Sequence, residues 1–262
     1  MSRLSEGLSG IGRPVLASLE FVGDCAELSW QSIRQAWRKP VEIGETIHQM
    51  AFLGAASVPI VALTTFSSGA VIALYSADIL VRYGAGNLAG GTVGLAVTRE
   101  IAPVLAGIMV AARGGSAMAA QIGTMAVTEQ IDALRALNVS PIKYLVIPRL
   151  VAAALVLPIL SLVGCYAGIF GGWLVSVYAS RVPSGSFMQS LQQFVEVRDI
   201  WGGMLKTVVF GLIVSLVACR EGMRTKNGAV GVGRSTTSTV VITMVLIYLA
   251  NFAMTWLLFR GR

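Results

Sequence analysis

The sequence has 262 residues, of which 55% are hydrophobic and only 13% are Asp, Glu, Lys or Arg. Soluble domains average about 25% charged residues, so the composition excludes an ordinary soluble protein and predicts an all-α integral membrane protein. The formal net charge of +7 does not indicate nucleic-acid binding, because Lys and Arg lie between apolar segments and do not cluster with aromatic residues. Three distant cysteines and one histidine predict neither a metal site nor a disulfide framework.

Residues 1–50 form an amphipathic segment that we expect at the cytoplasmic surface of the membrane. From Pro14 to Trp37, apolar residues recur at steps of three or four. Trp30 and Trp37 suit the boundary between lipid headgroups and hydrocarbon. The pattern predicts an interfacial helix, and a cytosolic helix packed on the membrane bundle is the alternative that the sequence leaves open.

Residues 51–262 form the expected transmembrane domain, because five apolar segments are each long enough to cross a bilayer, which takes about 20 residues. The predicted spans cover about 51–75, 84–127, 142–180, 200–219 and 239–259. The second segment is longer than a bilayer is thick and contains Arg99, Glu100 and Arg113. It must therefore tilt, break or extend out of the membrane.

Five spans place the two termini on opposite sides of the membrane. Lys and Arg are more frequent in the N-terminal segment, after the second span and after the fourth span than on the other side. The positive-inside rule therefore predicts a cytoplasmic N-terminus. A short surface helix is expected on the far side, between the third and fourth spans, where Phe187, Leu191 and Phe194 lie at helical spacing.

A short amphipathic helix is predicted over residues 128–138, between the second and third spans. Thr128 is the expected N-cap, and Glu129 lies in the first turn, where the helix dipole favours an anion. Asn138 can adopt the left-handed conformation that ends a helix, and Pro141 blocks continuation. The apolar stripe is Ile131, Leu134 and Leu137, and the polar stripe is Glu129, Asp132 and Arg135.

Small residues spaced by four predict close contacts between helices, because they let backbones approach each other in lipid. The three runs are Gly86, Gly90 and Gly94; Gly115, Ala119 and Gly123; and Gly164, Gly168 and Gly172. Tandem runs indicate a tightly packed bundle or a dimer. They do not distinguish contacts within one chain from contacts between two chains.

The stretch "GAVGVGRST", Gly228 to Thr236, nearly matches the phosphate-binding pattern GxxxxGK[ST], with Arg234 in the place of the lysine. A phosphate loop needs a preceding strand and a soluble α/β sheet. Here apolar spans lie on both sides, so we expect a flexible cytoplasmic loop and no nucleotide site in this chain.

Arg99 and Glu100 lie inside the second apolar segment, where a charge costs about 2.5–3.5 kcal/mol. Neighbouring helical residues point in different directions and cannot simply pair with each other. Lys206 is a candidate partner. One interpretation is an ion-pair network that fixes the packing of the helices, and the other is a polar patch in a cavity that accepts lipid or solute. No nucleophile–base pair or carboxylate dyad is evident, so the chain is not expected to be an enzyme.

Three blocks of the sequence resemble the MlaE/YrbE permease family of ABC lipid transporters. They are "TREIAPVLAGIMVAARGGSAMAAQIGTMAVTEQIDALRALNVSPIKYLVIPRLVA" (Thr98 to Ala152), "RDIWGGMLKTVVFG" (Arg198 to Gly211) and "GAVGVGRSTTSTVV" (Gly228 to Val241). The resemblance covers most of the chain after residue 40. It implies a homodimer in the bacterial inner membrane, with a periplasmic C-terminus.

The resemblance also implies partners. These are a cytoplasmic ABC ATPase dimer that binds ATP and Mg, a periplasmic Mce-domain lipid-binding protein and, in some systems, a small accessory subunit. The chain itself would hold no cofactor. The 128–138 helix would be the coupling helix, in which Ile131 and Leu134 anchor it to the ATPase or face the bundle. The residues expected to contribute to coupling are Thr128, Glu129, Gln130, Ile131, Asp132, Leu134 and Arg135.

Residue by residue, Arg99 and Glu100 fall on the family's Arg-Glu pair, and Lys206 falls on its lysine before a small hydroxyl residue. The resemblance implies that these three lie near the lipid cavity between two permeases. Gln121 stands where relatives often carry glutamate, and Ala126 stands where they often carry a basic residue. Roles of those charges do not transfer to this chain.

The leading hypothesis is therefore the permease subunit of an ATP-driven transporter that moves phospholipid, or a similar lipid, between the inner membrane and a periplasmic lipid-binding partner. One alternative is an ion-coupled secondary transporter that uses Arg99 and Glu100. The other is a membrane scaffold that transports nothing.

Overall fold

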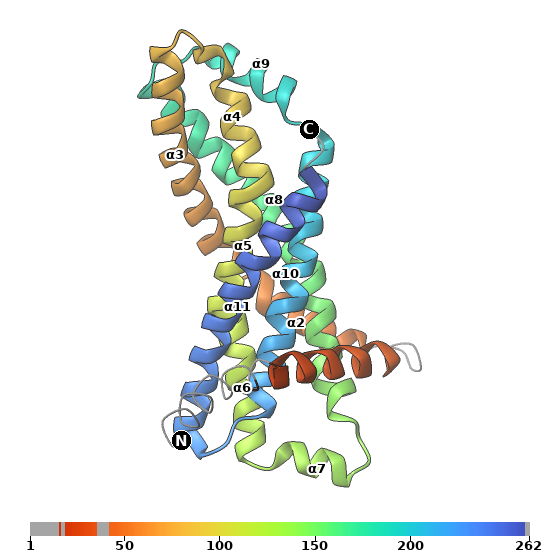
Figure 1. Ribbon diagram of the computed structural model, residues 1–262. Coiled ribbons are helices and arrows are strands. Elements are labelled where there is room, and N and C mark those ends of the chain that lie inside the picture. The colour runs from red at the N-terminus through yellow and green to blue at the C-terminus, as the bar shows by residue number, and fades with distance from the viewer. Residues whose placement is uncertain (1–15, 17–18, 36–41, 260–262) are drawn as a thin grey trace, which may run out of the picture.

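The computed structural model describes residues 16, 19–35 and 42–259, and these form one elongated bundle (Figure 1). Within these residues the chain is helical between short turns and contains no strand. A helix over residues 19–35, here called the N-terminal helix, comes first. The α-helices that follow are α2 (Ile43–Gly54), α3 (Val58–Arg82), α4 (Ala89–Ala96), α5 (Ala102–Val110), α6 (Ser116–Val127), α7 (Gln130–Ala136), α8 (Ile147–Tyr178), α9 (Ser184–Phe194), α10 (Val197–Met223) and α11 (Gly228–Phe259).

Five helical segments of the described chain are long and apolar enough to cross a membrane, which confirms the predicted all-α membrane protein. They are Ile43–Arg82, Gly86–Val127, Ile142–Tyr178, Val197–Met223 and Gly228–Phe259. The first segment bends at residues 55–57, between α2 and α3. Helix α3 continues to Arg82, well beyond the predicted end of the first span at residue 75.

The fifth segment begins much earlier than predicted. Residues 228–238 are the first turns of α11 and not a flexible loop, so the prediction for Gly228–Thr236 was wrong. Ser and Thr made this region look polar in the sequence. Their hydroxyls bond to carbonyls of the same helix, as Ser235 Oγ does to Val232 O at 2.9 Å and Thr239 Oγ1 does to Ser235 O at 2.8 Å. This bonding satisfies the hydroxyl groups without breaking the helix.

The second segment runs without a break from Gly86 to Val127. A short 3-10 turn (Gly86–Leu88) opens it. Two π-helical turns, Val97–Ile101 and Ala111–Gly115, lie within it. Such turns insert a residue into an α-helix and often mark functional sites. A third π-helical turn, Ile142–Val146, leads into α8. Each of the three π-turns contains a basic residue.

Helix α8 lies at the centre of the bundle and contacts α2, α3, α5 and α10. A Cβ atom added to Gly168 would lie 2.8 Å from a methyl of Val97, and one added to Gly172 would overlap Val93. Gly164 faces Thr65 and Ala102 in the same way. This run of glycines therefore packs within the chain, against α3 and the second segment.

The other small-residue runs also pack within the chain. A Cβ atom at Gly90 would overlap the carbonyl of Phe187, and one at Gly94 would overlap Leu191, so this run receives α9. Gly86 lies at the hairpin between α3 and α4, close to Val81. Residues Gly115 and Gly123 face α10 and α11.

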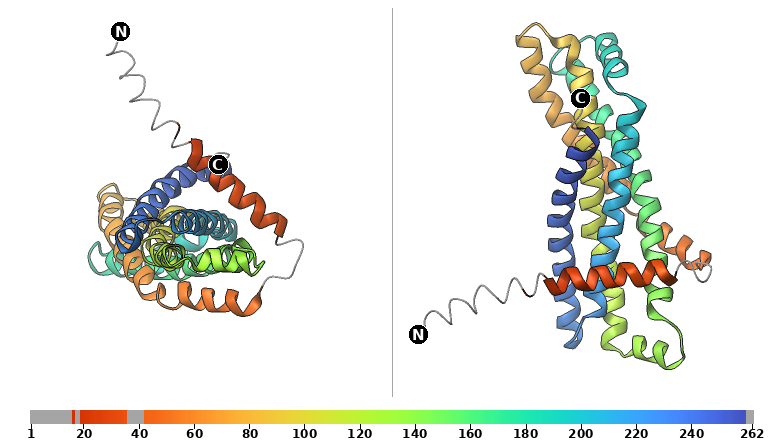
Figure 2. Two further views of the ribbon diagram at one scale, coloured as in Figure 1. Left: turned by 90° about the horizontal axis from the view of Figure 1, so that it is seen from below. Right: turned by 45° about the vertical axis from the view of Figure 1, so that its right-hand side comes forward.

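The two ends of the bundle differ. Helix α7 and the N-terminal helix lie at one end, and α9 and the last turn of α11 lie at the other (Figures 1 and 2). The N-terminal helix runs across the bundle axis (Figure 2). One of its faces is apolar and exposed, through Leu19, Val22, Trp30 and Ile33, while other residues contact α10. Pro14 and Trp37, the predicted limits of this helix, lie outside the described residues.

Candidate functional site

The π-helical turn Val97–Ile101 directs Arg99 and Glu100 to different partners. Arg99 pairs with Asp199 at the start of α10, with Nη2 2.8 Å and Nε 3.0 Å from Oδ1. The Asp199 side chain is fully buried and also accepts a bond from the backbone N–H of Glu196. Asp199 thus caps α10 and neutralises Arg99 at once. Asp199 is not among the site residues predicted from the sequence, although the Glu196-x-x-Asp199 pattern is that of a capping box.

Glu100 binds Lys206, the partner that the sequence suggested. Lys206 Nζ lies 2.8 Å from Glu100 Oε1, 2.8 Å from the carbonyl of Arg99 and 2.7 Å from Thr255 Oγ1. Its three ammonium protons therefore each have an acceptor, as a fully buried ammonium requires. The second oxygen of Glu100 accepts a 2.8 Å bond from Asn251 Nδ2.

The end of α11 closes over these cations. The ring of Phe259 lies 4.8 Å from the guanidinium carbon of Arg99 and 5.2 Å from Lys206 Nζ. The same ring would collide with a Cβ atom at Gly202. Aromatic faces attract cations, so Phe259 adds to the network while it covers the start of α10.

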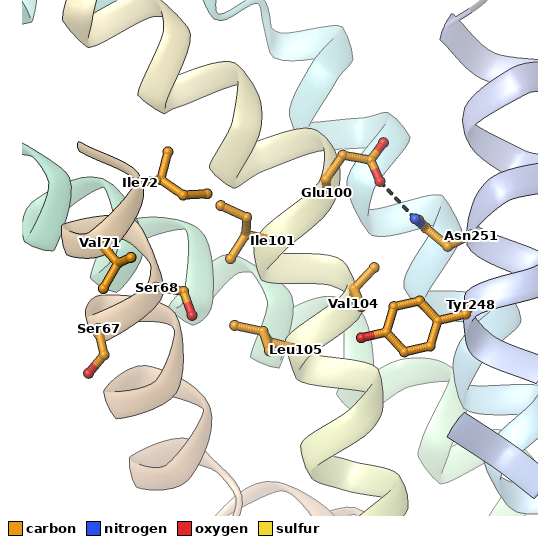
Figure 3. A pocket seen from close by; sticks show the side chains of 10 residues that line it. All are labelled: Ser67, Ser68, Val71, Ile72, Glu100, Ile101, Val104, Leu105, Tyr248 and Asn251. Carbon is orange, nitrogen blue, oxygen red and sulfur yellow. Dashed lines mark hydrogen bonds between the residues drawn. The ribbon is translucent and has the colours of Figure 1, made fainter. Parts of the chain in front are cut away.

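A cleft of about 550 Å³ lies between α3, the second segment and α11 (Figure 3). Figure 3 shows the Glu100 carboxylate turned toward Asn251 of α11, at one edge of the cleft. The remaining walls are mostly apolar. The lining residues are Ser67, Ser68, Val71, Ile72, Glu100, Ile101, Val104, Leu105, Tyr248 and Asn251. Such a cleft can hold an amphipathic molecule, with a polar group near Glu100 and an apolar chain beside Val104.

Arg113, the third charge of the second segment, sits in the π-helical turn Ala111–Gly115. Its Nη1 donates to the carbonyl of Phe52 and to Ser57 Oγ, each at 3.2 Å. Its guanidinium also lies 5.6 Å from the Phe52 ring. Arg113 thus fastens the bend between α2 and α3, so its partners are structural and none of them lies in the cleft.

Helix α7 spans Gln130–Ala136, shorter than the predicted 128–138. Thr128 is not its N-cap, because Thr128 ends α6 and its hydroxyl bonds to Thr124 O at 2.8 Å. The chain then turns at Glu129, whose φ is 59° and which takes the N-cap position. Asn138 also has a positive φ of 59°, as predicted for the end of this helix.

The two faces of α7 point to different surroundings. Ile131 is 5% exposed and packs with Ile122, Leu145 and Cys219 of the bundle, and Leu134 lies beside them. These apolar residues therefore face the chain's own bundle. The exposed face carries Glu129, Gln130 and the Asp132–Arg135 ion pair of 2.8 Å. That face is free to meet another protein.

Comparison with known proteins decides what kind of molecule this is. The profile of the MlaE permease family matches residues 46–257. The chain belongs to the MlaE permease family. It is 42% identical to a probable ABC transporter permease of Rickettsia typhi over 95% of this chain and 96% of that protein. It is 41% identical to a probable ABC transporter permease of Synechocystis over 82% of each chain.

A plant protein is related as well. The chain is 38% identical to the chloroplastic protein TRIGALACTOSYLDIACYLGLYCEROL 1 of Arabidopsis thaliana, over 82% of this chain and 62% of that protein. Membership of the MlaE family makes the chain a permease subunit of an ABC transporter, which works with an ATPase partner and is not itself the ATPase. The ion-coupled and scaffold alternatives receive no support from these matches.

The sequence departs from the family pattern at Gln121 and Ala126, and these two residues have different surroundings in the structure. Gln121 accepts a 3.2 Å bond from Nη2 of Arg149, whose Nη1 donates to Leu145 O at 2.7 Å. Arg149 is only 4% exposed, so the uncharged amide of Gln121 accepts a bond from a buried cation. Ala126 packs near Ile131 and Leu145 and adds no charge before α7.

The three cysteines lie in helices of the described part of the chain. All three cysteines are unpaired thiols. Burial raises the pKa of the Cys25 thiol, and nearby Arg220 only partly opposes this effect. Across residues 19–35 and 42–259, no group of three or more His, Cys, Asp or Glu side chains is placed to hold a metal ion.

Proposed function

We propose that this permease moves phospholipid between the bacterial inner membrane and a periplasmic lipid-binding protein of the Mce-domain type. The cleft between α3, the second segment and α11 carries the proposal. It combines mostly apolar walls with a polar corner at Glu100 and Asn251 and two serines on the α3 wall, which matches a molecule that has acyl chains and a headgroup. The galactolipid in the name of the Arabidopsis relative supports a lipid as cargo.

The cleft would be completed by a second copy of the chain. Helix α11, which forms one wall, is covered by the rest of the chain over little of its surface. Its outward residues are large and apolar: Val241, Val245, Tyr248, Leu249, Phe252 and Trp256. A two-fold homodimer that joins these faces would enclose the two clefts between the protomers.

ATP hydrolysis by a cytoplasmic ATPase dimer would drive the movement. The exposed face of α7 would dock on that ATPase, and the buried Ile131 and Leu134 would pass its displacement to the bundle. ATP and Mg would bind to the ATPase, so this chain would hold no cofactor. Docking of the ATPase on α7 would put α7 and the N-terminal helix in the cytoplasm, and α9 and the C-terminus in the periplasm. A small accessory subunit would complete some assemblies.

Charge reversal on α7 tests the coupling. We expect Glu129→Lys to remove the co-purifying ATPase, since Glu129 is exposed at the start of α7. Asp78→Lys makes the same change of charge at the other end of the bundle, where the Asp78 side chain is 51% exposed. This control should retain the ATPase. An ATPase that stays bound to Glu129→Lys would remove α7 from the interface.

Filling the cleft tests the lipid site. Val71 lines the cleft and is 52% exposed in the single chain, so Val71→Trp adds bulk there with little cost to folding. We expect fewer phospholipids per permease in the purified complex, counted by mass spectrometry. Ile159→Trp, on an exposed part of α8 outside the cleft, is the matched control. Equal phospholipid content in both variants would contradict the proposed site.

A further inference from the structure

The N-terminal helix is fastened to the end of α10 by a cluster of charges. Asp24 Oδ2 accepts bonds from Arg220 Nε at 3.0 Å and Nη2 at 2.8 Å, and lies 3.0 Å from Arg224 Nη1. Arg224 also pairs with Glu20. The guanidinium of Arg220 lies 4.6 Å from the ring of Phe21. One carboxylate therefore ties two arginines at the end of α10 to this helix.

The opposite end of the same helix is fastened beside α7. Ser140 Oγ lies 2.8 Å from Gln35 Oε1 and donates a hydrogen bond to it. Ser140 belongs to the short link between α7 and α8. The N-terminal helix thus connects two cytoplasmic elements that lie far apart in the sequence.

A polar hollow of about 480 Å³ separates the two attachments. The N-terminal helix contributes Glu27 and Gln31 to its walls, α7 contributes Arg135, and α10 contributes Arg220 and Met223. The middle of the N-terminal helix is therefore not packed tightly against α7. A displacement of α7 would reach this helix mainly through the Ser140–Gln35 bond.

The exposed apolar face of the N-terminal helix limits the movement of this helix in a second way. Leu19, Val22, Trp30 and Ile33 are each more than half exposed and suit a lipid surface. The helix also lies across the bundle axis (Figure 2). A helix held in this way can slide or rotate along the membrane surface but resists leaving it.

We propose that the N-terminal helix is a strap that transmits the displacement of α7 to α10, and that Asp24 is the positioning residue at its α10 end. The inference rests on the proposed docking of the ATPase on α7. The contacts run from Ser140 to Gln35, along the strap to Asp24 and Arg220, and along α10 to Lys206. Lys206 binds Glu100 in the wall of the cleft, so the strap gives the ATPase a second route to the lipid site, besides the direct packing of Ile131 on the bundle.

Two variants each remove the attachment at one end of the strap. Asp24→Asn removes the charge by which the N-terminal helix holds Arg220, which keeps its partner Glu221 in α10, and Ser140→Ala removes the hydroxyl that binds Gln35. The complex with its ATPase is reconstituted into vesicles of phosphatidylethanolamine and phosphatidylglycerol that carry a fluorescent phospholipid. ATP hydrolysis and lipid movement are then measured in the same sample. We expect either variant to lower the lipid moved per ATP hydrolysed about fivefold, within the range for changes along a coupled chain of contacts.

Two further variants separate coupling from folding. Asp24→Glu keeps a carboxylate and should restore most of the ratio, which a role of side-chain shape alone would not show. Glu27→Gln changes a neighbouring acid of the same helix that bonds only to Gln31 among the described contacts, and should leave the ratio unchanged. Lower yield of Asp24→Asn and Ser140→Ala with an unchanged ratio would overturn the strap.

A distance measurement distinguishes this inference from the proposed function. Spin labels at Ala136 and Lys226, both exposed, report the spacing between the ends of α7 and α10. With ATP and vanadate, we expect a narrow distribution of distances between the two labels when Asp24 is present. We expect a broader distribution in the Asp24→Asn complex. Broadening in a complex that moves no phospholipid would support the strap and refute the lipid proposal. Identical distributions in a complex that does move phospholipid would refute the strap alone.

Discussion

The two ends of the bundle use the same chemical groups in opposite ways. At the α9 end, the Asp199 and Lys206 side chains are both fully buried, and each pairs with a residue of the second segment. At the α7 end, the Arg224 and Glu20 side chains are 48% and 59% exposed, and the Arg220–Asp24 pair lies between these extremes. A buried pair must stay fully bonded, whereas an exposed pair can break and form again at little cost. The first arrangement suits a fixed register and the second suits a moving joint.

Removal of Lys206 should have the largest effect. Lys206→Met leaves Glu100 without its cation and should lower the free energy of unfolding by about 3 kcal/mol. We place the loss at the lower end of the usual range because the Glu100 side chain is 39% exposed. Unfolding of the complex in mixed micelles measures it. The double variant Lys206→Met/Glu100→Gln removes both charges and should recover most of the loss; if it does not, the pair is not what stabilises this end.

Asp199→Asn should cost slightly less, about 2 kcal/mol, because the amide still fits the capping position but leaves Arg99 unpaired. The decisive observation is its response to salt. A fully buried carboxylate is poorly screened, so the difference from the unmodified protein should be the same at low and high salt. A loss that disappears in high salt would mean that this pair resembles the exposed pairs at the α7 end.

The residues in these two predictions also show which buried charges could be found from the sequence. The cost of a charge in lipid drew attention to Arg99 and Glu100, and Lys206 followed because it lies in another apolar span. Asp199 was missed because it falls just outside the predicted fourth span, at the end of the polar stretch for which a short surface helix was predicted. In the structure, α10 begins at Val197, so this carboxylate belongs to the helix.

The misplaced helix ends have local causes. Thr128 has the right chemistry for an N-cap, but α6 continues to Val127 and the chain reverses at Glu129 in a left-handed conformation. A non-glycine residue with positive φ is uncommon, so the sequence pattern gave no sign of that turn. The glycine runs correctly predicted close contacts between helices. Their partners, such as α9 for Gly90, depend on tertiary contacts that spacing alone does not specify.

The backbone is packed much more tightly at Gly69 than at Gly44. A Cβ atom at Gly69 of α3 would overlap the carbonyl of Gly168 of α8, and neither backbone can move freely. Gly69→Ala should therefore lower the free energy of unfolding by about 1–2 kcal/mol, despite the better helix propensity of alanine. Gly44→Ala in α2 meets no atom within 4 Å and should be neutral or slightly stabilising. Equal effects at both sites would mean that α3 and α8 do not approach each other this closely.

The smallest effect is expected at the exposed end of the strap. Glu20→Gln removes one partner of Arg224, while Asp24 still lies 3.0 Å from that arginine. Exposed pairs of this kind contribute about 0.2–1 kcal/mol, and we expect a value at the lower limit that vanishes in high salt. Its comparison with Asp199→Asn under the same two salt conditions is a direct test of the contrast. If both losses persist in high salt, the α7 end is as rigidly fastened as the α9 end, and a moving joint there would need another physical basis.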